Sequence, residues 1–189
     1  MFTNRKRITI LIAIAALMNL ILFFCAYFLN LPLWLDTTGT IYAALILGFP
    51  AGFIVAIINN VIQALFFYGL ESLRFYLVSA LTTLVTGLIM SHLAHRPILK
   101  WFLLTLSLWV LSTSLAILLT FIAYNGVPAD HWGKLLYHQF LEITVPWRAT
   151  VLSVGSVKTL DILVSVALVA IAWCLTPKAL RTDKVAVRQ

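Results

Sequence analysis

Charge is scarce in this sequence. Of its 189 residues only 10% are charged, whereas 62% are hydrophobic and 13% are aromatic. A soluble domain of this size carries far more charge, because polar groups must cover its surface. The composition therefore excludes a soluble globular protein, and no stretch of the chain is long or polar enough to form a second, soluble domain.

Catalytic motifs are missing as well. The sequence has no G-x-x-x-x-G-K-[ST] loop for ATP, no H-E-x-x-H and no G-x-S-x-G, so it lacks the familiar sites of ATPases and hydrolases. His92 and His95 are three residues apart, but no acid or cysteine beside them completes a metal site, and their role stays open. We expect no enzymatic activity, no cofactor and no metal ion.

Two further patterns are absent, which argues against particular classes of membrane protein. No apolar run carries the regularly spaced arginines of a voltage sensor, and no inverted repeat is visible, which argues against a secondary transporter that works alone. The two cysteines, Cys25 and Cys174, lie near opposite ends of their predicted helices. No disulfide bond between them is therefore expected.

What the sequence has instead is a series of apolar runs. They cover residues 8–29, 37–47, 51–68, 75–93, 99–124 and 157–175. A helix that crosses the hydrocarbon core needs about 20 residues, and only the second run is clearly shorter. The first run is too long for a signal peptide, and no small-x-small cleavage site follows it. We predict an all-α integral membrane protein with one transmembrane domain, residues 1–189.

The segment 36–68 can cross the membrane once or twice, and the positive-inside rule decides between these topologies. With two crossings, nine of the 13 lysines and arginines fall in the cytoplasm, whereas one crossing divides them seven to six. We therefore predict six spans in the cell membrane with both termini cytoplasmic, an outer loop 125–156 and a basic tail 176–189 on anionic lipid. This topology explains the net charge of +7 without nucleic acid as a partner.

Polar residues in and beside the apolar runs are candidates for a binding site. Asp36 precedes the second run, and Asn59 and Gln63 share one face of the third. In a bilayer such groups face a partner or a cavity, which predicts a small-molecule site. The alternative is structural, because Asp36 can cap a helix and the two amides can link helices by hydrogen bonds.

The predicted outer loops carry further polar residues that either bind a small molecule or have a structural role. Glu71 and Arg74 can pair at i, i+3, an interaction of only a few tenths of a kcal/mol on a surface. Residues 125–156 contain a predicted amphipathic helix, marked by Tyr137, Leu141 and Val145 at helical spacing. This helix is either a lid over a site or an interfacial helix without a ligand.

The segment from Asp36 to Asn60 resembles the S components of energy-coupling factor (ECF) transporters. The pattern is an acid and Thr-Gly-Thr before an apolar run, then Gly-Phe-Pro-Ala-Gly, then a second apolar run into asparagine. Members of this family are the substrate-binding subunits of vitamin and micronutrient importers. They bind ligand near the outer face and dock onto a membrane scaffold (T) subunit that carries two ATPases. The resemblance implies the same function and partners here, and a missing ATP loop fits it.

The resemblance also implies roles for particular residues. The implied substrate site comprises Trp34 and Asp36 in the covering loop, Arg74, Trp147 and Arg148 in other outer loops, and Asn59, Gln63, Lys158 and Asp161 on the helices below. Small residues on the first run, Thr9, Ala13 and Ala16, form the implied docking face, with Thr9-x-x-x-Ala13 in place of the Ala-x-x-x-Ala of many S components. Aromatic and mixed polar groups suit an aromatic, polar or zwitterionic molecule.

Two other functions remain open from the sequence. A similar Asp-x-x-Gly-Thr pattern with a Gly-Pro-Gly break also occurs in membrane domains attached to signalling enzymes, which makes a membrane sensor the first alternative. The second is a structural scaffold of the cell envelope without a ligand. In that case Asp36, Arg74 and Arg148 only anchor loops.

Overall fold

The computed structural model describes residues 4–92 and 97–177, and within these ranges the chain is helical with no strand. The helices are α1 (Asn4–Phe28), α2 (Thr38–Leu47), α3 (Phe49–Gln63), α4 (Tyr76–His92), α5 (Pro97–Tyr124), α6 (His131–Leu141) and α7 (Pro146–Leu175). A π-helical turn, η1 (Ala64–Tyr68), extends α3, and a 3-10 turn, η2 (Leu70–Phe75), leads into α4. The predicted all-α class is confirmed.

In the part of the chain that the structure describes, five helical stretches are long and apolar enough to cross a membrane, which is compatible with a multi-pass membrane protein. They are Arg5–Phe28, Phe49–Tyr68, Leu70–His92, Ile98–Tyr124 and Pro146–Leu175. The remaining apolar helix, α2, has ten residues and is about 15 Å long, half of the roughly 30 Å of hydrocarbon in a bilayer. Six spans were predicted, and the described residues contain five helical stretches of spanning length and one shorter apolar helix.

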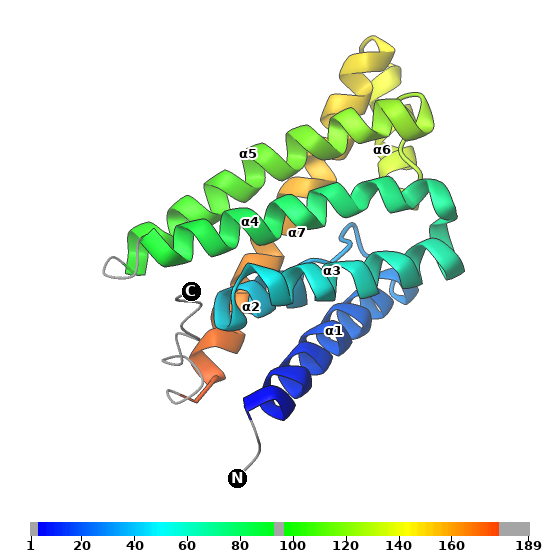
Figure 1. Cartoon of the computed structure of the whole chain (residues 1–189). Helices are drawn as coiled ribbons and strands as arrows, with labels where there is room; N and C mark the ends of the chain where they lie inside the picture. Colours follow the sequence, from blue (N-terminus) through cyan, green and yellow to red (C-terminus); the bar gives the residue numbers. More distant parts are fainter. Residues whose placement is uncertain (1–3, 93–96, 178–189) are drawn as a thin grey trace.

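The short helix α2 lies in the middle of the bundle, in contact with α1, α3, α4 and α7. Figure 1 places it between α3 and α7, with α4 and α5 side by side across the bundle. Small residues make this position possible, because a side chain at Gly39 would collide with the backbone carbonyl of Ala15 on α1. Asn19 of α1 accepts a hydrogen bond from the backbone N–H of Gly39 and donates one to Thr40 Oγ1 at 3.0 Å.

Asp36 does not cap this helix, so the capping prediction is wrong. The N-cap residue is Thr37, which makes no side-chain capping bond. The backbone N–H of Gly39 in the first turn instead donates to the side-chain oxygen of Asn19 on α1. Helix N-termini need an acceptor for their first N–H groups, but the acceptor does not have to be local. The Asp36 carboxylate is therefore not used in capping α2 and can interact with other groups.

The turn between α2 and α3 occurs at Gly48, which has φ +91°. Glycine adopts this conformation without steric cost. Pro50 follows in the first turn of α3, where proline is favoured. The tight turn predicted at Gly48–Gly52 is therefore present, although residues 49–52 already belong to α3.

The predicted outer loop 125–156 needs a correction. The amphipathic helix expected there is present as α6, but α7 already begins at Pro146, eleven residues before the predicted start of the last span at 157. Proline in the first helical turn and extended Val145 before it set this start. Polar residues such as Arg148 made the first turns of α7 look like a loop.

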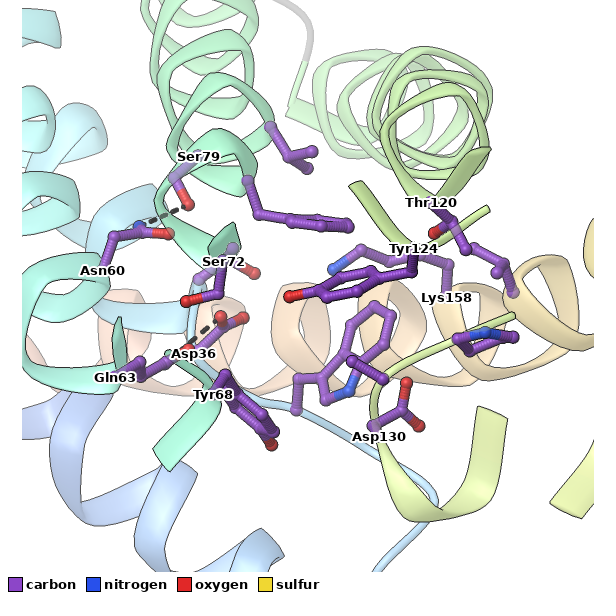
Figure 2. Close-up of a pocket in the computed structure, with 17 residues that line it drawn as sticks. Asp36, Asn60, Gln63, Tyr68, Ser72, Ser79, Thr120, Tyr124, Asp130 and Lys158 are labelled. Atoms are coloured by element: carbon purple, nitrogen blue, oxygen red, sulfur yellow. Dashed lines mark hydrogen bonds between the residues drawn. The ribbon is translucent and has the colours of Figure 1, made fainter. Parts of the chain in front are cut away.

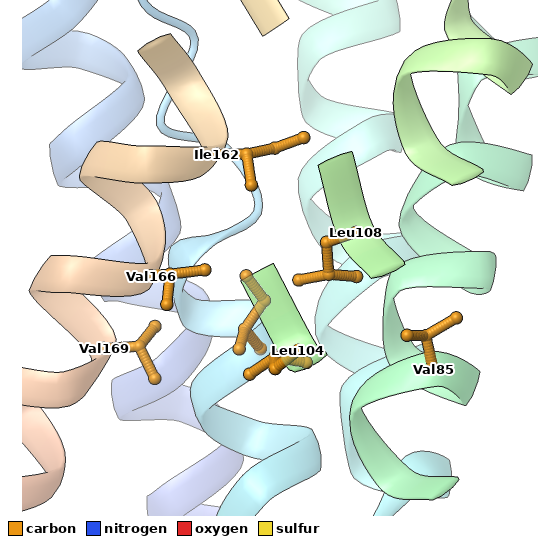
Figure 3. Close-up of a cluster of buried hydrophobic side chains, with 7 residues drawn as sticks. Val85, Leu104, Leu108, Ile162, Val166 and Val169 are labelled. Atoms are coloured by element: carbon orange, nitrogen blue, oxygen red, sulfur yellow. The ribbon is translucent and has the colours of Figure 1, made fainter. Parts of the chain in front are cut away.

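A cluster of buried apolar side chains joins α2, α4, α5 and α7 (Figure 3). Its buried members are Ile41, Val85, Leu104, Leu108, Ile162, Val166 and Val169. A separate buried apolar cluster on α4, α5 and α7 consists of Val78, Ala116, Leu119 and Val154. Between the two clusters in the sequences of α4 and α5, the buried Thr82 and Ser112 are joined by a hydrogen bond.

Replacing Gly39 with alanine tests the position of α2. We expect Gly39→Ala to destabilise the fold by about 1–3 kcal/mol, because the added Cβ meets the Ala15 carbonyl. Gly155→Ala in α7 is the matched control, since nothing lies within 4 Å of a Cβ there and alanine is the better helix former. Thermal unfolding in detergent checks both. Equal midpoints for the two variants would contradict the close contact of α1 and α2.

Candidate functional site

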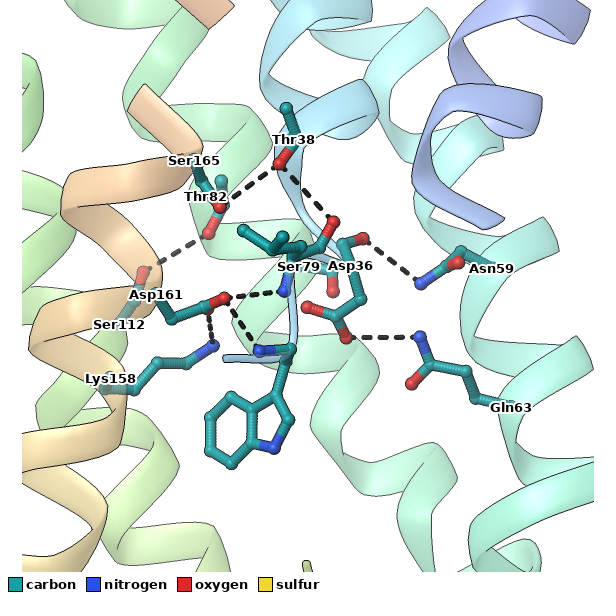
Figure 4. Close-up of polar contacts among 12 residues, drawn as sticks. Asp36, Thr38, Asn59, Gln63, Ser79, Thr82, Ser112, Lys158, Asp161 and Ser165 are labelled. Atoms are coloured by element: carbon teal, nitrogen blue, oxygen red, sulfur yellow. Dashed lines mark hydrogen bonds and ion pairs between the residues drawn. The ribbon is translucent and has the colours of Figure 1, made fainter. Parts of the chain in front are cut away.

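A buried ion pair on α7 holds the segment that precedes α2. Lys158 Nζ lies 3.0 Å from Oδ2 of Asp161, and both side chains are almost fully buried. The other oxygen of Asp161, Oδ1, accepts hydrogen bonds from the backbone N–H groups of Trp34 at 3.1 Å and Leu35 at 2.7 Å (Figure 4). A buried carboxylate needs such partners, and bonds to an ionised acceptor are strong. The Asp161 carboxylate thus fixes this segment to α7.

The segment is held in a specific shape. Leu35 has φ +52°, a left-handed conformation that bulky residues rarely adopt and that persists only where the surroundings impose it. One turn farther along α7, Ser165 Oγ accepts a hydrogen bond of 3.1 Å from Thr38 Oγ1. The hydrogen bonds of Asp161 and Ser165 therefore define where residues 34–38 lie.

Asp36 is held from the opposite side by α3. Gln63 Nε2 donates to Asp36 Oδ2 at 3.3 Å, and Asn59 Nδ2 donates to the Asp36 backbone carbonyl at 3.1 Å. The other carboxylate oxygen, Oδ1, is out of solvent and accepts no well-formed hydrogen bond from the described residues. Two further charges lie near this carboxylate, the Lys158 ammonium and the Asp161 carboxylate.

Asp36, Gln63 and Lys158 face a cavity of about 80 Å³ (Figure 2). It is lined by Trp34, Asp36, Thr37, Asn60, Gln63, Tyr68, Ser72, Phe75, Val78, Ser79, Thr120, Tyr124, Pro128, Ala129, Asp130, Val154 and Lys158. We call it the inner cavity. Its walls combine four aromatic rings with nine other polar or charged side chains, so the cavity is more polar than most small-molecule sites in proteins.

The one ammonium group of the inner cavity has partners within the protein. Lys158 Nζ lies between the Asp161 carboxylate, 3.0 Å away, and the ring of Trp34, whose centroid is 4.3 Å away. A cation over an indole ring at this distance is attracted by its electrons. Lys158 therefore helps to orient Trp34 over the cavity and has little unpaired charge to offer to a ligand.

Asp130 closes the side of the cavity next to α6. Its carboxylate caps α6 by accepting a hydrogen bond of 2.7 Å from the backbone N–H of Gly133, as N-cap aspartates do. Burial raises the pKa of Asp130, and its hydrogen bond to Gly133 opposes this shift. The inner cavity thus has a carboxylate on two sides, Asp36 and Asp130.

A second, larger hollow of about 500 Å³ adjoins the inner cavity between α1, the segment before α2, η1 and the start of α6. We call it the outer groove. Four residues line both spaces, namely Trp34, Tyr68, Ala129 and Asp130. Across the groove, Trp132 Nε1 of α6 donates a 2.8 Å hydrogen bond to the Asn30 carbonyl. Residues 30–37 are thereby attached to α6 at one end and to α7 at the other.

The structure brings some of the expected site residues together and separates others. Trp34, Asp36, Gln63 and Lys158 line the inner cavity. Asn59 and Asp161 do not line the cavity, but their side chains form hydrogen bonds with the backbone of residues 34–36.

Three expected site residues lie elsewhere. Arg74 pairs with Glu71 at 2.7 Å on the surface, as predicted for that pair. Trp147 and Arg148 are exposed on the first turn of α7, with the guanidinium 5.1 Å from the indole centroid. They do not reach the cavity because this turn is helical and directs them outward.

The implied docking residues do not form one free face of α1. Thr9 and Ala13 are exposed, but Ala16 is buried against Ala43 of α2 and Ala51 and Val55 of α3. Outside these sites, Cys25 and Cys174 are both exposed and are not joined by a disulfide bond, and His92 is exposed. His95 and most of the predicted basic tail lie outside the described residues.

Several lining residues were not predicted from the sequence, among them Asn60, Tyr68, Tyr124 and Asp130. Asp130 had a usable signal, because it precedes a helix at capping distance from Gly133. The two tyrosines had none, since aromatic residues at the ends of apolar helices also occur as simple interface anchors.

Asp36 and Asp161 should respond differently to neutralisation. We expect Asp161→Asn to lower the free energy of unfolding by about 3 kcal/mol, because Lys158 loses its buried partner. Asp36→Asn should leave stability unchanged or raise it, since one oxygen of this carboxylate is out of solvent without a well-formed hydrogen bond among the described residues. Thermal unfolding of both variants checks this. Equal losses in the two variants would contradict the difference in their pairing.

Comparison with known proteins adds no relative of this chain. No family model matches it, no curated protein matches it, and no solved structure matches it.

Proposed function

We propose that this chain is the substrate-binding subunit of an importer of the energy-coupling factor type, with its substrate in the inner cavity. The observation that carries this proposal is the Asp36 carboxylate, one oxygen of which has no hydrogen-bond partner among the described residues and which lines a cavity between apolar helices. A buried polar group without a partner is costly, and ionisable groups inside membrane proteins usually mark a ligand or ion path. A scaffold without a ligand has no use for this arrangement.

In the topology we propose, the six crossings include one made of two parts. Residues 30–37 are not helical and α2 has ten residues. Eight residues reach at most about 26 Å and α2 adds about 15 Å, so the two parts together can make one crossing even though the first part contains turns. The non-helical part lies beside the inner cavity, where its backbone contacts Asp161 and Asn59.

The positions of the basic residues support a cytoplasmic location for both termini. Arg5 and Lys6 at the start of α1 and Lys100 near the start of α5 lie toward the end of the bundle opposite α6, as does the end of α7 (Figure 1). The positive-inside rule favours the cytoplasm for such an end. The inner cavity, the outer groove and α6 then face the outside of the cell membrane.

The proposed mechanism is capture followed by reorientation. A vitamin or a similar micronutrient enters at the outer face, and residues 30–37 and α6 enclose it. The subunit then tips within the membrane and releases its ligand inside. Because the sequence has no ATP-binding loop, the energy comes from partners, which we propose to be a membrane scaffold subunit and two ATPases. The exposed part of α1 around Thr9 and Ala13 is our candidate docking face, since small residues allow close helix contact.

Purification from native membranes in mild detergent tests the proposed partners. We expect the chain to bring down one membrane scaffold protein and two ATPases. Ala13→Trp should reduce their recovery, because it places a large side chain on the candidate docking face. Ile57→Trp on the exposed side of α3 is the control and should not. Recovery of a kinase or cyclase would indicate a membrane sensor instead, and recovery of the chain alone would contradict import by this mechanism.

The bound substrate gives a second test. Small molecules released by denaturing the purified protein can be identified and quantified by mass spectrometry. We expect the wild-type chain and Arg148→Ala to retain the same compound, because Arg148 is exposed and lies outside the cavity. Asp36→Leu should lose at least about 90% of it, as one buried charge-assisted hydrogen bond is worth more than a factor of ten. Full retention in Asp36→Leu would place the ligand elsewhere.

A further inference from the structure

The two adjoining spaces differ in size and in chemistry. The inner cavity, at about 80 Å³, is smaller than the roughly 300–1,000 Å³ of pockets that enclose a whole small molecule. It has room for a compact polar group only. The outer groove, at about 500 Å³, is lined largely by aromatic side chains, including Phe23, Tyr27 and Phe67. A single ligand can therefore occupy both spaces only if its compact polar end enters the inner cavity and its larger apolar end stays in the groove.

The charges of the inner cavity favour one sign for that polar end. Asp36 offers an oxygen that is buried and has no well-formed hydrogen bond within the described part of the chain. Asp130 supplies a second carboxylate where the cavity meets the groove. The ammonium of Lys158, in contrast, is already matched by Asp161 and lies over the Trp34 ring. An incoming cation gains an unpaired acceptor, whereas an incoming anion meets two carboxylates.

The passage between the two spaces is suited to the same ligand. Trp34 and Tyr68 line both the inner cavity and the outer groove, so a bound molecule must pass between or beside their rings. Aromatic faces attract cations and stack on flat rings. The same aromatic surfaces give no advantage to a carboxylate or a phosphate.

We propose that the ligand is a small aromatic cation, with its positively charged N–H group against Oδ1 of Asp36 in the inner cavity and its ring in the outer groove. This inference rests on the proposed function, because it names the chemical class of the substrate that the proposed importer binds in the same site. Removal of a cation from water requires a counter-charge, which Asp36 supplies. The Asp36 oxygen that has no well-formed hydrogen bond among the described residues then accepts one from the bound cation.

Three matched probes test the sign of the charge, namely benzamidine, benzamide and benzoate. They have nearly the same shape and are positive, neutral and negative at neutral pH. We expect isothermal titration of the purified full-length chain to show benzamidine binding at least about tenfold more tightly than benzamide, and benzoate binding more weakly than either. Asp36→Asn should reduce benzamidine binding to the level of benzamide.

Two further variants separate a specific contact from general electrostatics. Asp130→Asn keeps an oxygen that can cap α6 and should weaken benzamidine binding by a smaller factor. Should Asp36→Asn fail to fold, Asp130→Asn tests the charge dependence alone. Glu71→Gln removes an exposed carboxylate that pairs with Arg74 outside both spaces, and should change nothing.

The outcomes of this experiment differ from those that test import. Equal or tighter binding of benzamide or benzoate, no binding of any probe, or benzamidine binding that survives in both aspartate variants would each overturn the cationic ligand and leave import possible. A chain that purifies without partners yet binds benzamidine selectively would support the ligand class while contradicting import.

Discussion

The arrangement of the site depends on the buried carboxylate of Asp161. One oxygen neutralises Lys158, and the other accepts the backbone N–H groups of Trp34 and Leu35. The first interaction places an ammonium beneath the Trp34 ring, and the second fixes the segment that presents Asp36. Neither Trp34 nor Asp36 lies on a helix, so without Asp161 nothing regular in the backbone determines where their side chains point.

Asp36 and Asp161 show how differently one bundle treats two buried carboxylates. Asp161 has every interaction that a buried anion needs, and it contributes to the fold. The Asp36 carboxylate has one hydrogen bond, at 3.3 Å, and one oxygen without a well-formed partner among the described residues, an arrangement that is expected to lower stability. Proteins commonly keep such costly groups where they serve function. The contrast separates a residue that shapes the site from one that is available to a ligand.

Much of the fold could be predicted from the sequence, since apolar runs define membrane helices and Gly48 marks the turn between α2 and α3. Trp34, Asp36, Gln63 and Lys158 were also predicted to meet, and they line one cavity. The predictions that were wrong depended on contacts between residues distant in sequence. Asn19 of α1, not Asp36, accepts the hydrogen bond from the start of α2. Trp147 and Arg148 lie on the helical start of α7 and point outward. No local pattern encodes such contacts.

The separation of the apolar cluster around Leu104 from the inner cavity has a consequence for the evolution of the bundle. α4, α5 and α7 contribute to both, but the cluster and the cavity share no residue. Substitutions at cavity residues therefore leave the side chains of this cluster in place, and their effects on recognition and on this part of the packing are nearly independent. A lineage built on this bundle can change what it recognises by a few replacements around the cavity, while the cluster continues to specify the same fold.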